Sequence, residues 1–296
     1  MPSKNEAFKL VTDKQFYMDG FLRDNLIEVP KFLKKSWDCV IIASGHSKVR
    51  IGKSTIAVQM GYYIAWELAG GNKMKVKDEV PFTIENICFT PDELMEKAEK
   101  FPRNSVFVYD EAMTGLNSSR AMENINKSML DFFTECGQYG HVIIIVLPNF
   151  FRLNEDIAIP RSLFLVDVYT DQRYNRGRFA FYNEFKKEML YTYGKKKYGS
   201  FLKYNATYPN FRGKFTKFFP IDVEDYDNRK KDAIRKKRQT KFQKKMTKQR
   251  NVLMYLLNRE HKVTEKQIAE KISVMSGVKI TQPAVAEAIA TLLGDE

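Results

Sequence analysis

The sequence is poor in the residues that build metal and disulfide sites. Its 296 residues include only three histidines and three cysteines, and Cys39, Cys88 and Cys136 lie far apart with no CxxC pair. A structural zinc site needs cysteines or histidines at short, paired spacings, and a disulfide framework needs a closely spaced set of cysteines. The composition therefore argues against both, and we expect the cysteines to be reduced thiols in the core.

Long apolar runs are missing too. The longest, HVIIIVLPNFF at residues 141–151, is well short of the roughly 20 apolar residues that cross a bilayer. The first residues, MPSKNEAFKLVTDK, contain no apolar segment after a basic start. The sequence therefore predicts neither a membrane span nor a secretory signal, and we expect a cytoplasmic protein.

Negative charge is scarce in the second half of the chain. Residues 1–171 hold 20 Lys/Arg and 23 Asp/Glu, a net charge of −3, in a chain whose total net charge is +13. Residues 172–296 therefore hold 29 Lys/Arg and 13 Asp/Glu and carry +16. A basic region of this size indicates a polyanionic partner, most often nucleic acid.

Strand-like and helix-like segments alternate through the first half. Short β-branched runs are followed by segments with helical spacing that begin at Pro or end at Gly. This alternation predicts an α/β domain with a mainly parallel sheet and crossover helices. The predicted strands are CVIIAS (39–44), ENICFT (85–90), SVFVYDEA (105–112), HVIIIVLP (141–148) and RSLFLVDVYTD (161–171), and the predicted helices cover residues 54–71, 91–101 and 121–140.

The pattern changes after residue 171. Alternating apolar and polar residues in RFAFYNEF (178–185) and KEMLYTYG (187–194) predict an antiparallel hairpin. We therefore expect four parts, which are an α/β core at residues 1–171, an aromatic and basic β extension at 172–228, a cationic linker at 229–250 and a small helical module at 251–296.

The segment SGHSKVRIGKST (44–55) contains most of a phosphate-binding loop. A Walker A loop needs glycine where the backbone approaches phosphate, lysine to reach the β- and γ-phosphates, and Ser or Thr to hold Mg²⁺. Its second half is present, but Ser47 stands where the first glycine usually lies, and Gly45 comes two residues earlier. The candidate nucleotide-binding residues are Gly45, Ser47, Lys48, Arg50, Ile51, Gly52, Lys53, Ser54 and Thr55.

A second motif, VFVYDEA, lies 57 residues beyond Lys53 and places Asp110 and Glu111 at the end of a predicted strand. In P-loop enzymes the Asp at this point supports Mg²⁺, and an adjacent Glu is placed to polarise the attacking water. A DE pair after a strand is common by chance. Together with GKST, and with a strand and a helix between them, it indicates a site for ATP and Mg²⁺.

These two motifs resemble those of P-loop ATPases of the additional-strand, catalytic-glutamate class and, more loosely, of the HerA–FtsK branch with Zot-like phage proteins and viral genome-packaging ATPases. The resemblance covers about residues 38–170. It implies a RecA-like core, with Lys53 on phosphate, Ser54 and Asp110 on Mg²⁺ and Glu111 as the catalytic glutamate. It also implies that Asn149, after VIIIVLP, senses the γ-phosphate, although a plain loop residue after Pro148 is an equal alternative.

Enzymes of this class often assemble as rings in which a neighbouring subunit inserts an arginine into the site. We therefore expect a homo-oligomer, with a ring as the form to test. The candidate arginines are Arg120, Arg152 and Arg161, and an ordinary surface role is the alternative for each. Lys48, five residues before Lys53, also matches the dimeric partition-type ATPases, but their internal glycines are missing here, and a solvated basic loop is the alternative.

The basic half offers two candidate DNA-binding segments. Residues 172–219 combine 12 Lys/Arg with 15 Phe/Tyr, a composition that suits stacking on bases and contact with phosphate. The same aromatics could equally form the buried face of a hairpin. Residues 229–250 contain 12 Lys/Arg and one Asp, so we expect a flexible or helical linker that self-repulsion keeps off the protein. The candidate phosphate contacts are Arg235, Lys236, Lys237, Arg238, Lys244 and Lys245.

The C-terminal residues are similar to a helix-turn-helix or winged-helix module. Thr264 and Gln267 form a capping box before the second predicted helix, and Thr281 precedes the third. That third helix contains no Lys or Arg. Docking to a protein partner is therefore an alternative to reading DNA bases.

The motifs together favour an ATP-driven DNA-handling protein that translocates, packages or transfers a viral or mobile genome, in the cytoplasm of its cell or host or on a virion. Two alternatives stay open. One is a partition or helicase-loading ATPase that uses the nucleotide as a switch. The other is a transcriptional regulator that binds ATP without turnover.

Overall fold

The computed structural model describes residues 7–9, 15–35, 37, 39–45, 50–71, 80–110, 139–198 and 206–293. The chain divides into two compact units, Met1–Lys230 and Lys231–Glu296. The first unit includes both the predicted core and the predicted β extension. None of the described helices is long and apolar enough to cross a membrane.

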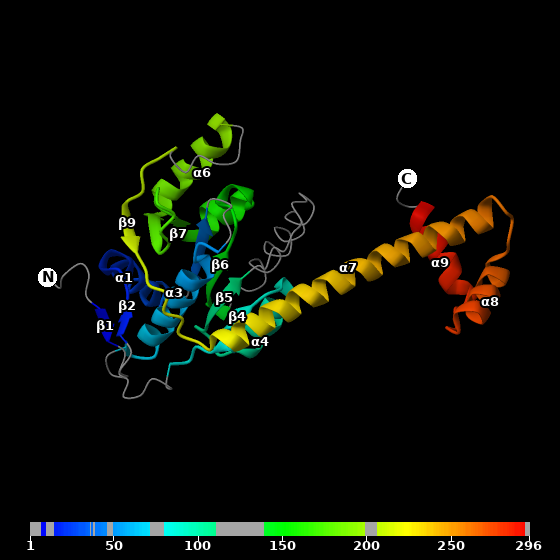
Figure 1. Ribbon diagram of the computed structural model, residues 1–296, viewed down its shortest axis with the longest axis horizontal. Helices are drawn as coiled ribbons and strands as arrows, with labels where there is room; N and C mark the ends of the chain where they lie inside the picture. Colours follow the sequence, from blue (N-terminus) through cyan, green and yellow to red (C-terminus); the bar gives the residue numbers. More distant parts are fainter. Residues whose placement is uncertain are drawn as a thin grey trace. The chain divides into compact units, whose positions relative to one another are not determined.

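The first unit is built on a seven-stranded sheet (Figure 1). Its strand order is β4-β5-β6-β3-β7-β8-β9, and the strands from β4 to β7 are parallel to their neighbours. Strands β8 and β9 extend one side by antiparallel pairing. This mostly parallel α/β sheet is compatible with a RecA-like core. The strands are β3 (Cys39–Gly45), β4 (Ile87–Cys88), β5 (Val106–Asp110), β6 (Val142–Val146), β7 (Ser162–Tyr169), β8 (Arg178–Tyr182) and β9 (Phe211–Lys214).

Strand register brings the carboxyl ends of the central strands to one edge. Asp110 of β5 pairs with Val146 of β6, and Val146 pairs with Ala43 of β3. Ala43 is therefore level with the end of β5, and β3 continues two residues further, to Gly45. Parallel sheets place ligand sites at this edge, because the loops that leave the strands converge there.

Helices cover both faces of the sheet. Helix α3 (Lys53–Leu68) lies on the face of Val108, where Gly61 allows close packing: a Cβ on Gly61 would lie 3.1 Å from Cγ2 of Val108. The other face, with Phe107 and Tyr109, packs against α4 (Pro91–Lys100) and α6 (Glu184–Tyr198). Both faces are apolar because strands of a parallel sheet are buried on each side.

Short elements surround this core. A two-stranded antiparallel sheet of β1 (Ala7–Lys9) and β2 (Gln15–Tyr17) precedes α1 (Gly20–Leu26) and α2 (Val29–Leu33). A 3₁₀ turn, η3 (Ile84–Asn86), leads into β4. Another, η5 (Phe150–Arg152), and the π-helical turn η6 (Ile157–Arg161) connect β6 to β7.

The predicted hairpin at residues 178–194 is wrong. Its first half is β8, but its second half lies in α6, which begins after Asn183. Asn183 Oδ1 accepts from the backbone N–H of Lys186 at 3.0 Å, an N-terminal cap that favours a helix. The buried positions of this helix include Lys187, Leu190, Tyr191 and Gly194, which follow helical and not strand spacing.

The second unit is helical. Helix α7 (Val223–Arg259) begins in the first unit and ends in this one, followed by α8 (Glu265–Ser276) and α9 (Gln282–Leu293). The capping box of Thr264 and Gln267 is confirmed. A small core holds these helices together, formed by Met254, Ile268, Ala269, Val285, Ala288 and Ile289. The helical character of the module is confirmed, and its assignment as helix-turn-helix stays a prediction.

Candidate functional site

The phosphate-loop candidate lies between β3 and α3, as the sequence predicts. Residues 46–49, with Ser47 and Lys48, lie outside the described part of the chain. Gly52 has a φ of +101° directly before α3 begins at Lys53. A left-handed conformation at this point favours glycine, and it turns the backbone into the first turn of a helix. Exposed N–H groups at such a helix start suit anionic oxygens.

The backbone of Arg50 and the packing of Ile51 define the conformation of the loop before Gly52. Arg50 has a φ of +58°, so an exposed arginine occupies a conformation that glycine adopts more easily. Ile51 is buried against Gly45, where a Cβ would lie 2.6 Å from Cδ1 of Ile51 and 3.1 Å from Cδ of Lys53. Gly45 thus leaves room for the neighbouring Ile51 and Lys53 side chains.

Asp110 and Ser54 converge in space. Asp110 ends β5 on the same face as Val108, which is the face that α3 covers. The hydroxyl of Tyr226, from α7, donates a hydrogen bond to Asp110 Oδ2 and is also hydrogen-bonded to Ser54. One hydroxyl therefore reaches both oxygens, so the serine and the carboxylate lie around a common point.

These two oxygens fit an Mg²⁺ ion. Mg²⁺ prefers a carboxylate and hydroxyl or water oxygens, and it usually takes only one or two protein ligands beside phosphate and water. Asp110 is 2% exposed, so its charge needs a cationic partner in the folded protein. Ser54 comes directly after the candidate phosphate lysine, where a P-loop places its metal ligand.

Two lysines supply positive charge at this edge. Lys230 Nζ of α7 lies 2.7 Å from Asp110 Oδ2 and 2.9 Å from the Tyr226 hydroxyl. Burial lowers the pKa of Lys53, the charges of Asp110 and Asp167 raise it, and the charge of Lys230 lowers it again. The two lysines therefore act on each other electrostatically beside Asp110.

A segment between β9 and α7 lies against α3. The amide of Gln59 donates to the carbonyl oxygens of Thr216 at 3.0 Å and Phe218 at 2.6 Å. The ring of Phe215 reaches Gly52, where a Cβ would lie 2.9 Å from ring atoms. This close approach is a second reason for glycine at residue 52.

The remaining catalytic candidates are not all at this edge in the described structure. Glu111 and Arg120 lie outside the described residues. Asn149 is buried and its Oδ1 accepts from the N–H of Phe151 at 2.9 Å, so it caps η5. This contact supports the plain loop role, and the sensor role stays a prediction. Arg152 is partly exposed in η5 and Arg161 is exposed at the end of η6.

Three residues near the site were missed by the sequence analysis. Tyr226 and Lys230 have helical i, i+4 spacing, but they lie at the edge of a charged run that gives no sign of contact with Asp110. The third, Asp167 of β7, is buried and accepts from Ser44 Oγ at 2.9 Å. An acidic residue inside the apolar run SLFLVDVY is a signal that could have identified it.

The structure describes the side chains of two of the six candidate DNA-binding residues and the backbone of all six. Arg235 and Lys236 are exposed on α7, and Lys237, Arg238, Lys244 and Lys245 belong to the same helix. The linker is thus helical, one of the two predicted forms. Its first two residues do pack against the protein, which corrects the expectation that self-repulsion keeps the whole segment away: Arg229 pairs with Glu85, and Lys230 with Asp110.

The aromatics of the β extension are divided between core and surface. Phe179, Phe181 and Phe211 pack together, with the rings of Phe181 and Phe211 stacked at 4.6 Å. Tyr174 and Tyr208 are 78% and 82% exposed. The aromatic residues of the described strands therefore form a buried face, and among the described rings the exposed ones are accessible for stacking on bases.

Comparison with known protein families gives a match for part of the chain. A family model described as zonular occludens toxin (Zot) matches residues 39–161, from the start of β3 to the end of η6. No curated protein and no solved structure matched the chain. Over the stretch that contains the phosphate loop and Asp110, the chain is therefore similar to the Zot family, a P-loop ATPase-like family found in phage.

Proposed function

We propose that the protein hydrolyses ATP to move, package or transfer DNA of a phage or mobile element. The observation that carries the proposal is the convergence of Lys53, Ser54 and Asp110 at the carboxyl edge of the sheet. The match to the Zot family supports the ATPase assignment and the phage context. Strand β6 between β3 and β5 supports the additional-strand class.

Each residue has a chemical task in this proposal. Lys53 and the N–H groups at the start of α3 bind the β- and γ-phosphates. Ser54 and Asp110 hold Mg²⁺, which neutralises phosphate charge when bound. Glu111 orients and polarises the attacking water, and an arginine from a neighbouring subunit of a homo-oligomeric ring stabilises charge in the transition state.

A pair of substitutions tests the nucleotide half of the proposal. Lys53→Ala should abolish binding of ATP, because it removes the contact with ground-state phosphates. Glu111→Gln should keep binding and lose turnover, because the glutamate acts mainly on water. Binding of a fluorescent ATP analogue and release of phosphate measure the two effects. Equal turnover in the wild type and Glu111→Gln would contradict the catalytic-glutamate assignment.

The DNA half of the proposal rests on the cationic part of α7. Replacing Arg235, Lys236, Lys237 and Arg238 by Gln in the full chain should weaken duplex binding and flatten the plot of log affinity against log salt, by somewhat under one unit for each phosphate that is no longer neutralised. The control replaces Lys31, Lys34, Lys35 and Lys100, four exposed lysines of the first unit, and removes the same charge. An equal decrease of affinity in both variants would show that the effect comes from net charge and not from the position of these four cations.

The effect of DNA on the rate of ATP hydrolysis distinguishes a DNA motor from a switch ATPase and from a transcriptional regulator. A motor should hydrolyse ATP faster when duplex DNA is added, and it should form a ring with an ATP analogue. A dimer with slow turnover unaffected by DNA would favour the partition or helicase-loading switch. Binding without turnover would favour the regulator.

A further inference from the structure

The start of α7 touches the oxygens that the proposed function assigns to Mg²⁺. Asp110 Oδ2 accepts from both the Tyr226 hydroxyl and Lys230 Nζ, and the same hydroxyl is hydrogen-bonded to Ser54. Lys230 Nζ also lies 5.2 Å from the centre of the Tyr226 ring. The two side chains are one helical turn apart, so a single face of α7 reaches both candidate metal ligands.

Apolar packing holds this turn of α7 in place. The Tyr226 ring is 5% exposed and lies 5.6 Å from the ring of Phe89 and 5.0 Å from that of Phe219. These ring contacts hold the Tyr226 side chain beside Asp110.

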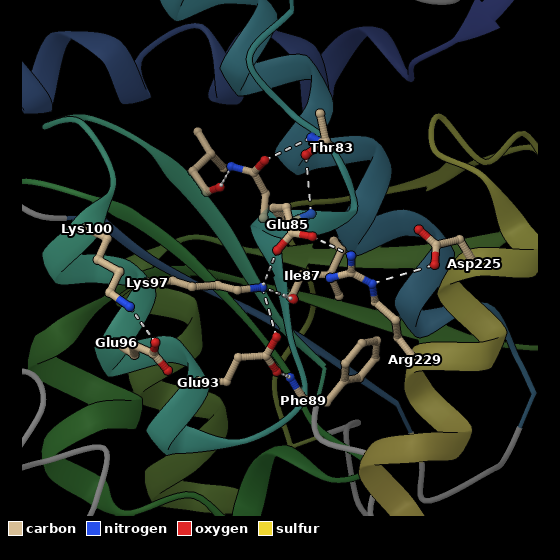
Figure 2. Close-up of polar contacts among 12 residues, drawn as sticks. Thr83, Glu85, Ile87, Phe89, Glu93, Glu96, Lys97, Lys100, Asp225 and Arg229 are labelled. Atoms are coloured by element: carbon tan, nitrogen blue, oxygen red, sulfur yellow. Dashed lines mark hydrogen bonds and ion pairs between the residues drawn. The ribbon is translucent and has the colours of Figure 1, made fainter.

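A chain of ion pairs lies along the outer side of the same turn (Figure 2). Arg229 bonds to Glu85, which precedes β4, and lies 3.6 Å from Asp225 within α7. Lys97 of α4 lies 3.3 Å from Glu85 and 2.8 Å from Glu93. These pairs are about a third to a half exposed at Arg229, Glu85 and Asp225, so they are weak and can be broken at low cost.

The contact between Lys230 and Asp110 competes directly with a metal ion for the carboxylate. An ammonium group and Mg²⁺ both seek the same carboxylate oxygen, and two cations beside one buried carboxylate repel each other. Asp110 Oδ2 already takes part in two hydrogen bonds, one of them from a protonated amine. A metal ligated by Asp110 Oδ2 and Ser54 would therefore have to displace the Lys230 ammonium group and the Tyr226 hydroxyl from that oxygen.

From these contacts we propose that residues 223–230, here called the α7 latch, close the metal side of the nucleotide site, and that Mg²⁺ with a nucleoside triphosphate releases them. The inference rests on the proposed function, because it deepens the regulation of that site. Lys230 acts as a stand-in cation for Asp110 in the nucleotide-free protein. Since α7 continues into the cationic segment, binding at the sheet edge changes how the root of that helix is held.

The test measures the latch and nucleotide binding separately in the full chain. Hydrogen exchange follows the amides of residues 223–235 in three states: nucleotide-free, with a non-hydrolysable ATP analogue and Mg²⁺, and with the analogue and EDTA. A fluorescent, non-hydrolysable ATP analogue gives the affinity with and without Mg²⁺. The variants are Lys230→Met, which keeps the aliphatic stem and removes the cation, and Lys231→Met, the exposed neighbour, as control.

The latch predicts a specific pattern. Exchange in residues 223–235 should rise about tenfold with analogue and Mg²⁺ but not with EDTA, because a docked helix exchanges more slowly than a released one. Lys230→Met should exchange faster without nucleotide and bind nucleotide with Mg²⁺ about three to ten times more tightly, since removing a competing closed state raises the apparent affinity. Lys231→Met should match the wild type.

Three results would overturn the inference in distinguishable ways. Measured binding with unchanged exchange in the wild type would show that the latch stays closed. Weaker binding in Lys230→Met would make Lys230 a nucleotide contact. Absence of nucleotide binding in both the wild type and Lys230→Met would remove the proposed function together with its latch, whereas binding in Lys230→Met alone would support both.

Discussion

Two regions of the first unit each hold a lysine ammonium group against protein oxygens, and they do so by opposite means. Lys230 at the edge of the sheet pairs with the carboxylate of Asp110. Lys187 of α6 is fully buried, and its Nζ donates to the carbonyl oxygen of Ile159 at 2.9 Å, to Ser162 Oγ at 2.7 Å and to the Ser162 carbonyl oxygen. Lys230 thus contacts a charged carboxylate, whereas these hydrogen-bond acceptors of Lys187 are uncharged oxygens.

The difference decides which contact can serve as a switch. Neutral carbonyls attract an ammonium group less than a carboxylate does, and burial lowers the pKa of Lys187 to about 8 despite the charges of Glu184 and Glu188. Backbone oxygens at the end of η6 cannot leave, so this contact fastens α6 to the connection before β7. Asp110 in contrast has a second candidate partner, Mg²⁺, so its lysine is exchangeable.

Of the changes that test this comparison, removal of the Asp110 carboxylate should have the largest effect. Asp110→Asn makes the surroundings of Lys230 neutral, like those of Lys187, and removes the anionic metal ligand. Since loss of an outer partner of a metal ligand costs about 10- to 100-fold in affinity, loss of the ligand itself should weaken Mg²⁺-dependent nucleotide binding by about a hundredfold or more. Titration of a fluorescent nucleotide with Mg²⁺ measures it, and unchanged affinity would reject Asp110 as the ligand.

The next largest effect should be the pH dependence of stability at the Lys187 site. The folded state releases the Lys187 proton near pH 8 and the unfolded chain near 10.5, so between these values the unfolded state binds more protons and stability rises with pH. The free energy of unfolding of the wild type should gain about 2 kcal/mol over Lys187→Met between pH 7.5 and 9.5. Urea unfolding of both proteins at each pH gives the difference, with Lys186→Met as control, and a constant difference would contradict the assignment.

Lys230→Met should change stability less than Lys187→Met does. The Lys230 side chain is 28% exposed, and Lys53 still offsets part of the Asp110 charge, so we expect a loss of about 1 kcal/mol at pH 7. Lys231→Met should leave the free energy of unfolding unchanged. A loss of several kcal/mol would mean that the pair is a structural element like that of Lys187.

The outer ion pair should matter least. Arg229→Gln removes the contacts with Glu85 and Asp225, whose side chains are 48% and 47% exposed. We expect a loss of about 0.5 kcal/mol that shrinks at high salt, because exposed pairs are screened. Thermal unfolding at low and high salt measures it, and a large loss insensitive to salt would contradict a weak outer anchor.

Much of the core could be predicted because local sequence and tertiary structure agree there. The strands around residues 39–44, 105–110 and 141–146 are apolar and bounded by turn residues, and each is found in the sheet. The hairpin at residues 178–194 was mispredicted because apolar and aromatic residues at i, i+3 and i+4 also fit a short alternating run. Only the cap at Asn183 distinguishes the two, and caps are easily overlooked in a polar segment.

Part of the site could also be predicted from the sequence. Lys53, Ser54 and Asp110 belong to motifs whose chemistry fixes their spacing, so their convergence follows from a parallel sheet. Tyr226 and Lys230 reach the same point from 116 and 120 residues beyond Asp110 in the chain. Sequence patterns give no account of such long-range contacts, and a lysine within a cationic run resembles its neighbours until the fold places it.

The order of strands in the sheet sets the order in which the chain can fold during synthesis. Strand β3 is made first among the seven, but its two neighbours are β6 at residues 142–146 and β7 at residues 162–169. Until the ribosome has released those residues, the apolar run Cys39–Gly45 has neither of its partners, and long-range pairing of this kind is slow and prone to aggregation. The loop that is proposed to hold the nucleotide is therefore among the first segments made and among the last to be built into a finished site.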